Sequence, residues 1–270
     1  MNTNYKLIVF DLDGTLAESK STVTPGVCEL LCKLLAVKEV AIISGGAYPQ
    51  FEKQLLSNLR CPQDLLAKLY ILPVSGSQSY RFKDGKWQQL TNHLLTSDEK
   101  TRITKAISDS LVGLSFALPE ETFGPQIEDR GSQITFSALG QQAPVPLKKA
   151  WDVDHKKREE FKTKIKARLP EFEVMEGGST SVDVTKRGVN KAFAVRDLMA
   201  ALSLNKSEVL YVGDALFPGG NDYVVTSLGI STRSVKGPVD SASIIAELLC
   251  NNSVCPQLKK SGLGASFERL

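Results

Sequence analysis

The sequence lacks the features that mark several broad classes of protein. No apolar run approaches the roughly 18 residues that span a bilayer, and the first apolar run is only four residues long, too short for the core of a signal peptide. Neither sign of charge is in excess, because 33 Lys and Arg stand against 30 Asp and Glu, for a net charge of +3. A summed charge of this size predicts neither a nucleic-acid nor an acidic-membrane partner. We therefore expect a cytoplasmic protein whose anion binding is local.

Cysteine and histidine are also scarce. The five cysteines are odd in number and do not form the closely spaced pairs that hold zinc. Cys28 and Cys32 lie four residues apart in an apolar helical pattern, where small buried cysteines are common. The two histidines, His93 and His155, have no partners at metal-ligand spacing and are expected at the surface. A reducing compartment fits this usage best.

What the chain does have is an alternation of buried strands and amphipathic helices. Unbroken apolar runs at residues 7–10, 40–43 and 209–212 predict strands buried on both faces of a parallel sheet. Apolar residues at helical spacing follow the first two runs, over residues 27–35 and 51–59. This order predicts a doubly wound α/β core.

The middle third of the chain has a different pattern. Asp84 and Gly85 lie between two partly polar strand-like stretches and predict a hairpin. The segments that follow predict an antiparallel sheet with helices on one face, inserted into the core. The expected organisation is a core over residues 1–79 and 187–250, an α+β insertion over 80–186 and a tail over 251–270.

A run of lysine and arginine over residues 156–168 suggests nucleic-acid binding at first sight. Glutamates interrupt the run, and Phe161, Ile165 and Leu169 recur at four-residue spacing along one side of the predicted helix. The pattern therefore favours a solvated amphipathic helix, and we expect neither a nucleic acid nor a membrane as partner.

Polar residues follow the buried runs at the points where the strands should end. In an open parallel sheet, ligands bind beyond the carboxyl ends of the strands, so these residues are candidates for chemistry. They are Asp11 and Asp13 after the first run, Ser44 with Gly45 and Gly46 after the second, Lys191 at a helix start, and Asp214 with Asp222 after the late run.

Carboxylates gathered at one sheet edge repel one another unless a cation lies among them. Oxygen ligands of this kind suit Mg²⁺, which pairs naturally with phosphate. One carboxylate, Asp11, could then attack phosphorus while Asp13 moves a proton. Lys191 and Ser44 could hold phosphate oxygens, and a lysine at a helix start is a poor placement unless an anion is also present. The set predicts phosphoryl transfer.

These motifs resemble those of the haloacid dehalogenase superfamily. Residues 11–15 (Asp-Leu-Asp-Gly-Thr) match its first motif, Ser44 its second, Lys191 its third, and Asp214 with Asp222 its fourth. The insertion resembles the cap of the branch that contains Cof-type sugar phosphatases, sucrose phosphatase and eukaryotic-type phosphomannomutase. The strongest resemblance is to phosphomannomutases, and it rests on residues 127–130, 177–183 and 217–222.

The resemblance implies a Rossmann-like doubly wound core with an inserted α+β cap and a magnesium-dependent phosphoryl-transfer reaction. It makes Asp11 the nucleophile and Asp13 the general acid and base, with Lys191 and Ser44 orienting the phosphoryl group. The implied magnesium ligands are Asp11, the backbone carbonyl of Asp13, and Asp214, with Asp222 close behind. The implied substrate-binding residues are Gly45, Gly46, Arg130, Gln133, Gln141, Ser181 and Asp183.

The sequence departs from the phosphomannomutase pattern in the cap and in the second motif. Gln141 and Lys148 stand where that pattern has its second and third arginines, and Ser44 precedes the glycine pair instead of following it. A mutase must grip the distal phosphate of a bisphosphorylated sugar, and this set is a weaker cationic clamp.

We therefore expect a phosphatase of a small phosphorylated metabolite, with a sugar phosphate as the expected substrate, acting as a monomer or a cap-mediated homodimer. One alternative is a phosphomannomutase in the same site, with Lys148 or Lys149 serving the distal phosphate. The other is a non-catalytic phosphosugar-binding module.

Overall fold

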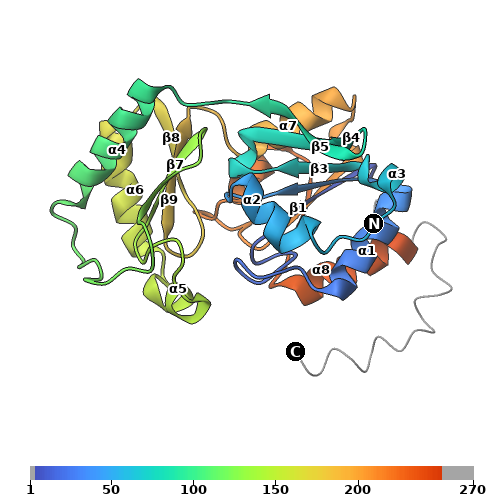
Figure 1. Ribbon diagram of the computed structural model, residues 1–270, viewed down its shortest axis with the longest axis horizontal. Helices are drawn as coiled ribbons and strands as arrows, with labels where there is room; N and C mark the ends of the chain where they lie inside the picture. Colours follow the sequence, from blue (N-terminus) through green and yellow to red (C-terminus); the bar gives the residue numbers. More distant parts are fainter. Residues whose placement is uncertain (1–3, 251–270) are drawn as a thin grey trace.

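A seven-stranded sheet forms the larger lobe of the computed structural model, which describes residues 4–250 (Figure 1). The central strands are parallel to one another, and each of the last two strands of the order pairs antiparallel with the strand before it. The order across the sheet is β11 (Ser231–Ser234), β10 (Val209–Gly213), β1 (Leu7–Asp11), β2 (Glu39–Ile43), β3 (Leu69–Leu72), β4 (Gln78–Lys83) and β5 (Lys86–Asn92).

Helical segments cover both faces of this sheet because its central strands are apolar on both sides. On one face, Ile8 and Phe10 share an apolar cluster with α1 (Pro25–Val37) and α8 (Pro238–Cys250). On the other face, alternate strand residues pack against α7 (Lys191–Ala201) and the 3₁₀ segment η4 (Tyr223–Leu228). The predicted Rossmann-like α/β core is confirmed.

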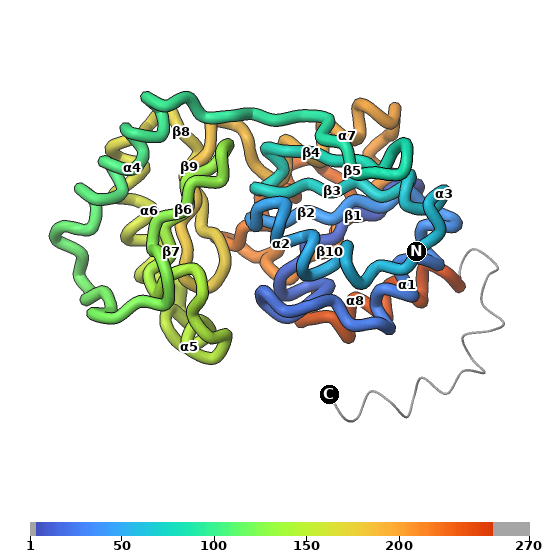
Figure 2. Tube along the Cα trace, viewed as in Figure 1, coloured from blue at the N-terminus to red at the C-terminus, as the bar shows by residue number. Residues whose placement is uncertain are grey.

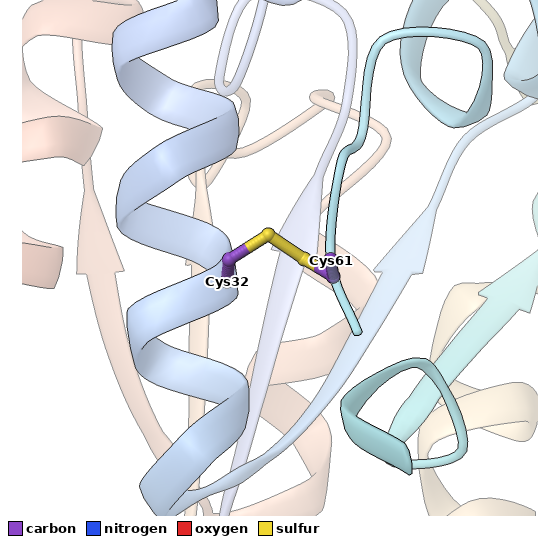
Figure 3. Close-up of a disulfide and its surroundings, with 2 residues drawn as sticks. All are labelled: Cys32 and Cys61. Atoms are coloured by element: carbon purple, nitrogen blue, oxygen red, sulfur yellow. A yellow bond between two sulfur atoms is a disulfide. The ribbon is translucent and has the colours of Figure 1, made fainter. Parts of the chain in front are cut away.

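The segment between β2 and β3 is tied to α1 by a disulfide. It contains α2 (Tyr48–Phe51), the π-helical segment η1 (Glu52–Leu56) and α3 (Gln63–Leu66). Cys61, which lies between η1 and α3, is bonded to Cys32 of α1, with Cα atoms 5.5 Å apart (Figure 3). Cys28 is a buried free thiol, as expected. The pairing of Cys32 does not fit the expected reducing compartment.

The predicted hairpin belongs to the core sheet, so the expected start of the insertion at residue 80 is wrong. Tyr80 and Arg81 of β4 pair with Ile71 and Tyr70 of β3. A short 3₁₀ turn, η2 (Val74–Gly76), reverses the chain and returns it beside β3. The partly polar pattern arises because β4 and β5 lie at the sheet's edge, where one side remains solvated.

A four-stranded antiparallel sheet forms the smaller lobe, which we call the cap (Figure 2). Its order is β6 (Ile127–Asp129), β7 (Gln133–Ser137), β9 (Ser181–Lys186) and β8 (Phe172–Glu176). Two helices, α4 (Ser97–Leu111) and α6 (Lys156–Arg168), pack on one face over an apolar cluster (Figure 1). The predicted antiparallel sheet with helices on one face is confirmed.

The free face of the cap sheet turns polar residues toward the core lobe. In β9, Val182 and Val184 enter the apolar cluster, whereas Ser181 and Asp183 point the other way and line a cavity between the lobes. The remaining helical segments are α5 (Val145–Trp151) in the cap and the 3₁₀ turn η3 (Lys206–Glu208) in the core.

Among residues 4–250, no helix is both long and apolar enough to cross a bilayer. The predicted tail over residues 251–270 lies outside the described residues.

Candidate active site

A cavity of about 440 Å³ lies between the core and the cap. Its core side is formed by the ends of parallel strands and the loops that follow them, and its cap side by the free face of the cap sheet. The lining includes most of the residues singled out from the sequence, namely Asp11, Asp13, Ser44, Gly45, Gly46, Arg130, Gln141, Ser181, Asp183 and Asp214.

Three carboxylates from distant parts of the chain meet at the core side of the cavity, where Asp11 and Asp214 line it and Asp222 is fully buried beside them. Asp11 ends β1, Asp214 follows β10, and Asp222 precedes η4; one oxygen of each lies within 4.8 Å of the others. Lys191, at the first position of α7, reaches into the cluster. Its Nζ lies 2.5 Å from Asp11 Oδ1 and 2.7 Å from Asp222 Oδ1. The parallel topology has therefore brought these four residues together.

The cluster carries more negative than positive charge. Three carboxylates and one ammonium give a formal charge of −2. Burial, followed by the charge of Asp222, raises the pKa of Asp214 to about 6. Burial also raises the pKa of Asp11 above its usual range. Burial alone would lower the pKa of Lys191, but Asp11 and Asp222 outweigh it and raise that pKa.

These residues fit a divalent metal ion. The donors are all oxygens, as hard cations require, and a charge of +2 would balance the cluster. The backbone is also shaped around the carboxylates, because Gly14 has a φ of +87° and a Cβ there would lie 2.3 Å from Asp214 Oδ2. Only glycine permits this approach.

Asp13 is held separately from the three clustered carboxylates. Its Oδ2 accepts hydrogen bonds from Gln50 Nε2 at 2.8 Å and Ser44 Oγ at 3.3 Å. Its Oδ1 accepts from Gln54 Nε2 at 3.1 Å and from the Lys20 backbone N–H at 2.5 Å. Sequence reasoning missed both glutamines, although their four-residue spacing after the second motif is a signal that could have found them.

The second-motif loop touches the cap directly. The carbonyl of Gly45 accepts hydrogen bonds from Arg130 Nη1 at 2.5 Å and Gln133 Nε2 at 3.4 Å. A Cβ on Gly45 would lie 3.2 Å from Asp183 Oδ2, and one on Gly46 would lie 2.3 Å from Gln50 Oε1. The two glycines therefore allow the core loop to approach both the cap and α2.

Of the predicted cap residues, Arg130 and Asp183 line the cavity, whereas Gln133 does not. Arg130 also donates to Glu128 Oε2 at 2.6 Å, and Asp183 accepts from Thr135 Oγ1 at 2.8 Å. Burial raises the pKa of Asp183, opposed by the charge of Arg130. Gln133 is fully buried and is not part of the cavity lining. It joins Thr135 to the core loop instead.

Two lysines converge on one carbonyl oxygen at the cavity wall. Lys20 Nζ donates to Gln141 O at 2.8 Å, and Lys148 Nζ donates to the same atom at 3.2 Å. Burial and the neighbouring Lys20 charge lower the pKa of Lys148 to about 8. Burial and the charge of Arg130 lower the pKa of Lys20. Lys20 comes from the core loop after the first motif and was missed from the sequence.

Further cap residues at the cavity were also missed. His155 has an exposed side chain, as expected, but it also lines the cavity and contacts the Phe217 ring edge-on, with centroids 5.4 Å apart. Arg158, expected on a solvated helix, is buried; it pairs with Asp152 Oδ2 at 2.7 Å and donates to Gly178 O at 2.6 Å. It therefore fixes the loop before β9, and the basic run is not wholly solvated.

Comparison with known proteins identifies the family to which the chain belongs. A family model described as haloacid dehalogenase-like hydrolase matches residues 8–223. The chain is 25% identical over 250 residues to a probable phosphomannomutase of Caenorhabditis elegans, covering 90% of this chain and 95% of the relative. It is 28% identical over 252 residues to the phosphomannomutase of Drosophila melanogaster, with the same coverage.

Two solved structures share the fold. One is an N-terminally truncated, IMP-bound IMP-nucleotidase of Plasmodium falciparum, with a TM-score of 0.71 and 17% identity over 91% of this chain and 68% of that one. The other is a haloacid dehalogenase-like hydrolase from Bacteroides thetaiotaomicron, with a TM-score of 0.58 and 17% identity over 88% of this chain and 92% of that one. The chain is thus a phosphoryl-transfer enzyme that belongs to the haloacid dehalogenase-like hydrolases.

Proposed function

We propose that the protein is a magnesium-dependent phosphatase that hydrolyses a small phosphorylated metabolite, a sugar phosphate, through an aspartyl-phosphate on Asp11. One observation carries this proposal: Asp11 lines the cavity beside Lys191 and two further carboxylates, while Asp13 is held apart by its own donors. That separation gives the two aspartates of the first motif different chemical environments, as a nucleophile and a proton carrier need.

In the first step, a carboxylate oxygen of Asp11 attacks phosphorus and the bond from phosphorus to the leaving oxygen breaks. Asp13 gives that oxygen its proton. In the second step, Asp13 takes a proton from a water molecule whose oxygen attacks phosphorus. The bond from Asp11 to phosphorus then breaks, and inorganic phosphate leaves.

The surrounding residues would neutralise and orient the transferring group. The proposed magnesium ligands are Asp11, the backbone carbonyl of Asp13, and Asp214, with Asp222 beside them. A magnesium ion there would neutralise charge on the phosphoryl oxygens. Lys191 and Ser44 would hold those oxygens in line for attack.

The cap residues at the cavity suit a polar leaving group of modest size. Ser181, Asp183 and Arg130 line the cavity opposite the carboxylates and offer both donors and acceptors, which suits sugar hydroxyls. The core loop and the cap are joined at Gly45, an arrangement that supports exclusion of bulk water during transfer. The relatives' name, phosphomannomutase, also favours a sugar phosphate.

The two lysines at the cavity wall favour the mutase as a second candidate function. Lys20 and Lys148 both donate to Gln141 O, so two ammonium groups lie beside position 141, where the phosphomannomutase pattern has an arginine. They could bind a distal phosphate. Lys149 is a weaker candidate for this role, because it pairs with Glu18 Oε2 at 2.9 Å.

The test is an assay with Mg²⁺ and mannose 1-phosphate, with and without a catalytic amount of a hexose bisphosphate, following phosphate and mannose 6-phosphate. We expect phosphate without isomer. Bisphosphate-stimulated isomer would instead make the protein a mutase. Binding of phosphosugars without turnover of any ester would favour a non-catalytic module.

An Asp11→Asn variant tests the mechanism separately. It removes the nucleophile but keeps the side chain's size, so turnover should be lost while the fold is kept. Persistent turnover in this variant would rule out the aspartyl-phosphate on Asp11.

A further inference from the structure

Tyr211 lies in the middle of β10, fully buried beneath the carboxylate cluster. Its ring packs in the apolar cluster on the face of the sheet that α7 and η4 cover. Lys191 begins α7 and Asp222 precedes η4. All three side chains therefore converge on the same side of the sheet, just below the edge where the cavity opens.

The Tyr211 hydroxyl is one of three donors that fix Asp222. It donates to Asp222 Oδ1 at 2.5 Å, and Lys191 Nζ donates to the same oxygen at 2.7 Å. The backbone N–H of Ala215 donates to Oδ2 at 3.1 Å. A strand, a helix start and the loop after the strand thus hold one fully buried carboxylate.

The backbone between Tyr211 and Asp222 is shaped for this contact. A Cβ on Gly213 would lie 2.3 Å from Asp222 Oδ2 and 2.9 Å from Tyr211 Cε1. Neither the ring nor the carboxylate could keep its place beside a larger residue. The glycine of the fourth motif therefore serves the approach of Asp222 to Tyr211 as well as the turn into the loop.

The hydroxyl determines how the Lys191 ammonium is shared. A carboxylate oxygen has about two acceptor positions, and on Asp222 Oδ1 the hydroxyl and the ammonium are both present. Because the hydroxyl supplies the second donor to this oxygen, the Lys191 ammonium is not drawn further toward Asp222 and keeps its contact with Asp11 Oδ1 at 2.5 Å. Without the hydroxyl, the less satisfied Asp222 oxygen would draw the ammonium away from Asp11 and from a phosphoryl group on it.

We propose that Tyr211 is a positioning residue for phosphoryl transfer, which acts by holding Asp222 and, through it, the Lys191 ammonium beside Asp11. This inference rests on the proposed function, because it assigns Asp11 and Lys191 their roles there. Tyr211 is not part of the cavity lining, and its hydroxyl reaches the carboxylate cluster through Asp222, so its effect is indirect.

The experiment compares Tyr211→Phe with Tyr70→Phe. Tyr70 is a matched control because it is buried in the same apolar cluster, and within the described chain its hydroxyl has no hydrogen-bond partner. Each variant loses one buried hydroxyl and keeps its ring. Four quantities are measured: kcat and KM for the substrate, the dissociation constant of Mg²⁺ from substrate-free protein by calorimetry, and the unfolding temperature in EDTA.

For Tyr211→Phe, we expect kcat to fall about 10-fold and Mg²⁺ to bind about 10-fold more weakly, the range seen when a residue behind a metal site is removed. KM for the substrate should change little, and Tyr70→Phe should match the wild type in both kcat and Mg²⁺ binding. A Tyr211→Phe protein with wild-type kcat and Mg²⁺ affinity but a lower unfolding temperature would reduce Tyr211 to a structural residue and overturn the inference.

The results that would contradict the proposed function differ from those that would contradict the role of Tyr211. If the wild type hydrolyses no phosphate ester, the phosphatase proposal fails on its own. The comparison of Mg²⁺ affinity between Tyr211→Phe and Tyr70→Phe still decides whether the hydroxyl organises the carboxylates: equal affinities overturn the inference, and weaker binding to Tyr211→Phe alone supports it.

Discussion

Lys191 Nζ lies 2.5 Å from Asp11 Oδ1, although 180 positions separate the two residues in the chain. The start of a helix is an unfavourable place for a cation. Here the carboxylates of Asp11 and Asp222 more than compensate, since they raise the pKa of the buried ammonium above its usual value. The pair joins the third motif to the first and sets the electrostatics of the whole site.

Lys191→Met should therefore destabilise the protein strongly. It leaves Asp11 and Asp222 buried without their cation, and breaking a buried pair in this way costs about 3–5 kcal/mol. At roughly 2–4 °C per kcal/mol for a chain of this size, thermal unfolding in EDTA should show a clear fall in Tm. Adding Asp222→Asn should recover part of that fall, because it removes one uncompensated charge. An unchanged Tm in the single variant would contradict this account.

Arg130→Ala should weaken binding of the leaving group. The guanidinium lines the cavity and bonds to the Gly45 carbonyl, and a hydrogen bond from a charged group contributes about 1.5–3 kcal/mol, or roughly 10- to 100-fold in KM. KM should rise far more for a sugar phosphate than for a small generic phosphate ester. Arg102→Ala, an exposed cap arginine outside the cavity lining, is the control. Equal rises for both esters would remove Arg130 from the leaving-group site.

Binding of a substrate with a second phosphate should weaken as the pH rises. The pKa of Lys148 is lowered to about 8, so most of its ammonium is charged at pH 7 and most is neutral at pH 9. KM for a bisphosphorylated sugar should therefore increase across this window, while KM for a monophosphate stays flat. Lys148→Arg keeps its charge throughout and should flatten the profile. A wild-type profile that Lys148→Arg leaves unaltered would exclude this lysine as the titrating group.

The Cys32–Cys61 bond should stabilise the core lobe. It closes a loop with a sequence separation of 29 residues, for which the chain-entropy estimate is about 3–4 kcal/mol. The Cys32→Ser/Cys61→Ser double variant should unfold at a lower temperature than the wild type under non-reducing conditions. Cys28→Ala removes a buried free thiol from the same helix and should lower Tm less. Free, titratable Cys32 and Cys61 thiols in the denatured, non-reduced wild type would show that the bond does not form.

The order of elements in the core could be predicted from the sequence because its signals are local. Fully apolar runs mark strands covered on both faces, as in β1, β2 and β10. Parallel strands place their carboxyl ends at one edge. Asp11, Asp214 and Lys191 could therefore be expected near one another without knowledge of any contact.

The sheet to which the hairpin of β4 and β5 belongs could not be predicted in this way. An alternating, partly polar strand has the same pattern at the edge of the core sheet as in a separate antiparallel sheet. Only the pairing of β4 with β3 decides between them. The Cys32–Cys61 bond depends in the same way on which loop folds back against α1.

The alternation of strands and helices, the polar residues after each strand and the chemistry open to those residues follow from the sequence pattern. Their partners follow from the folded arrangement: Lys20 beside Lys148, the glutamines on Asp13, the burial of Arg158 and the contact of Tyr211 with Asp222. The physical reason is that periodicity reports whether a side chain is buried, whereas its contacts depend on how distant segments approach in space.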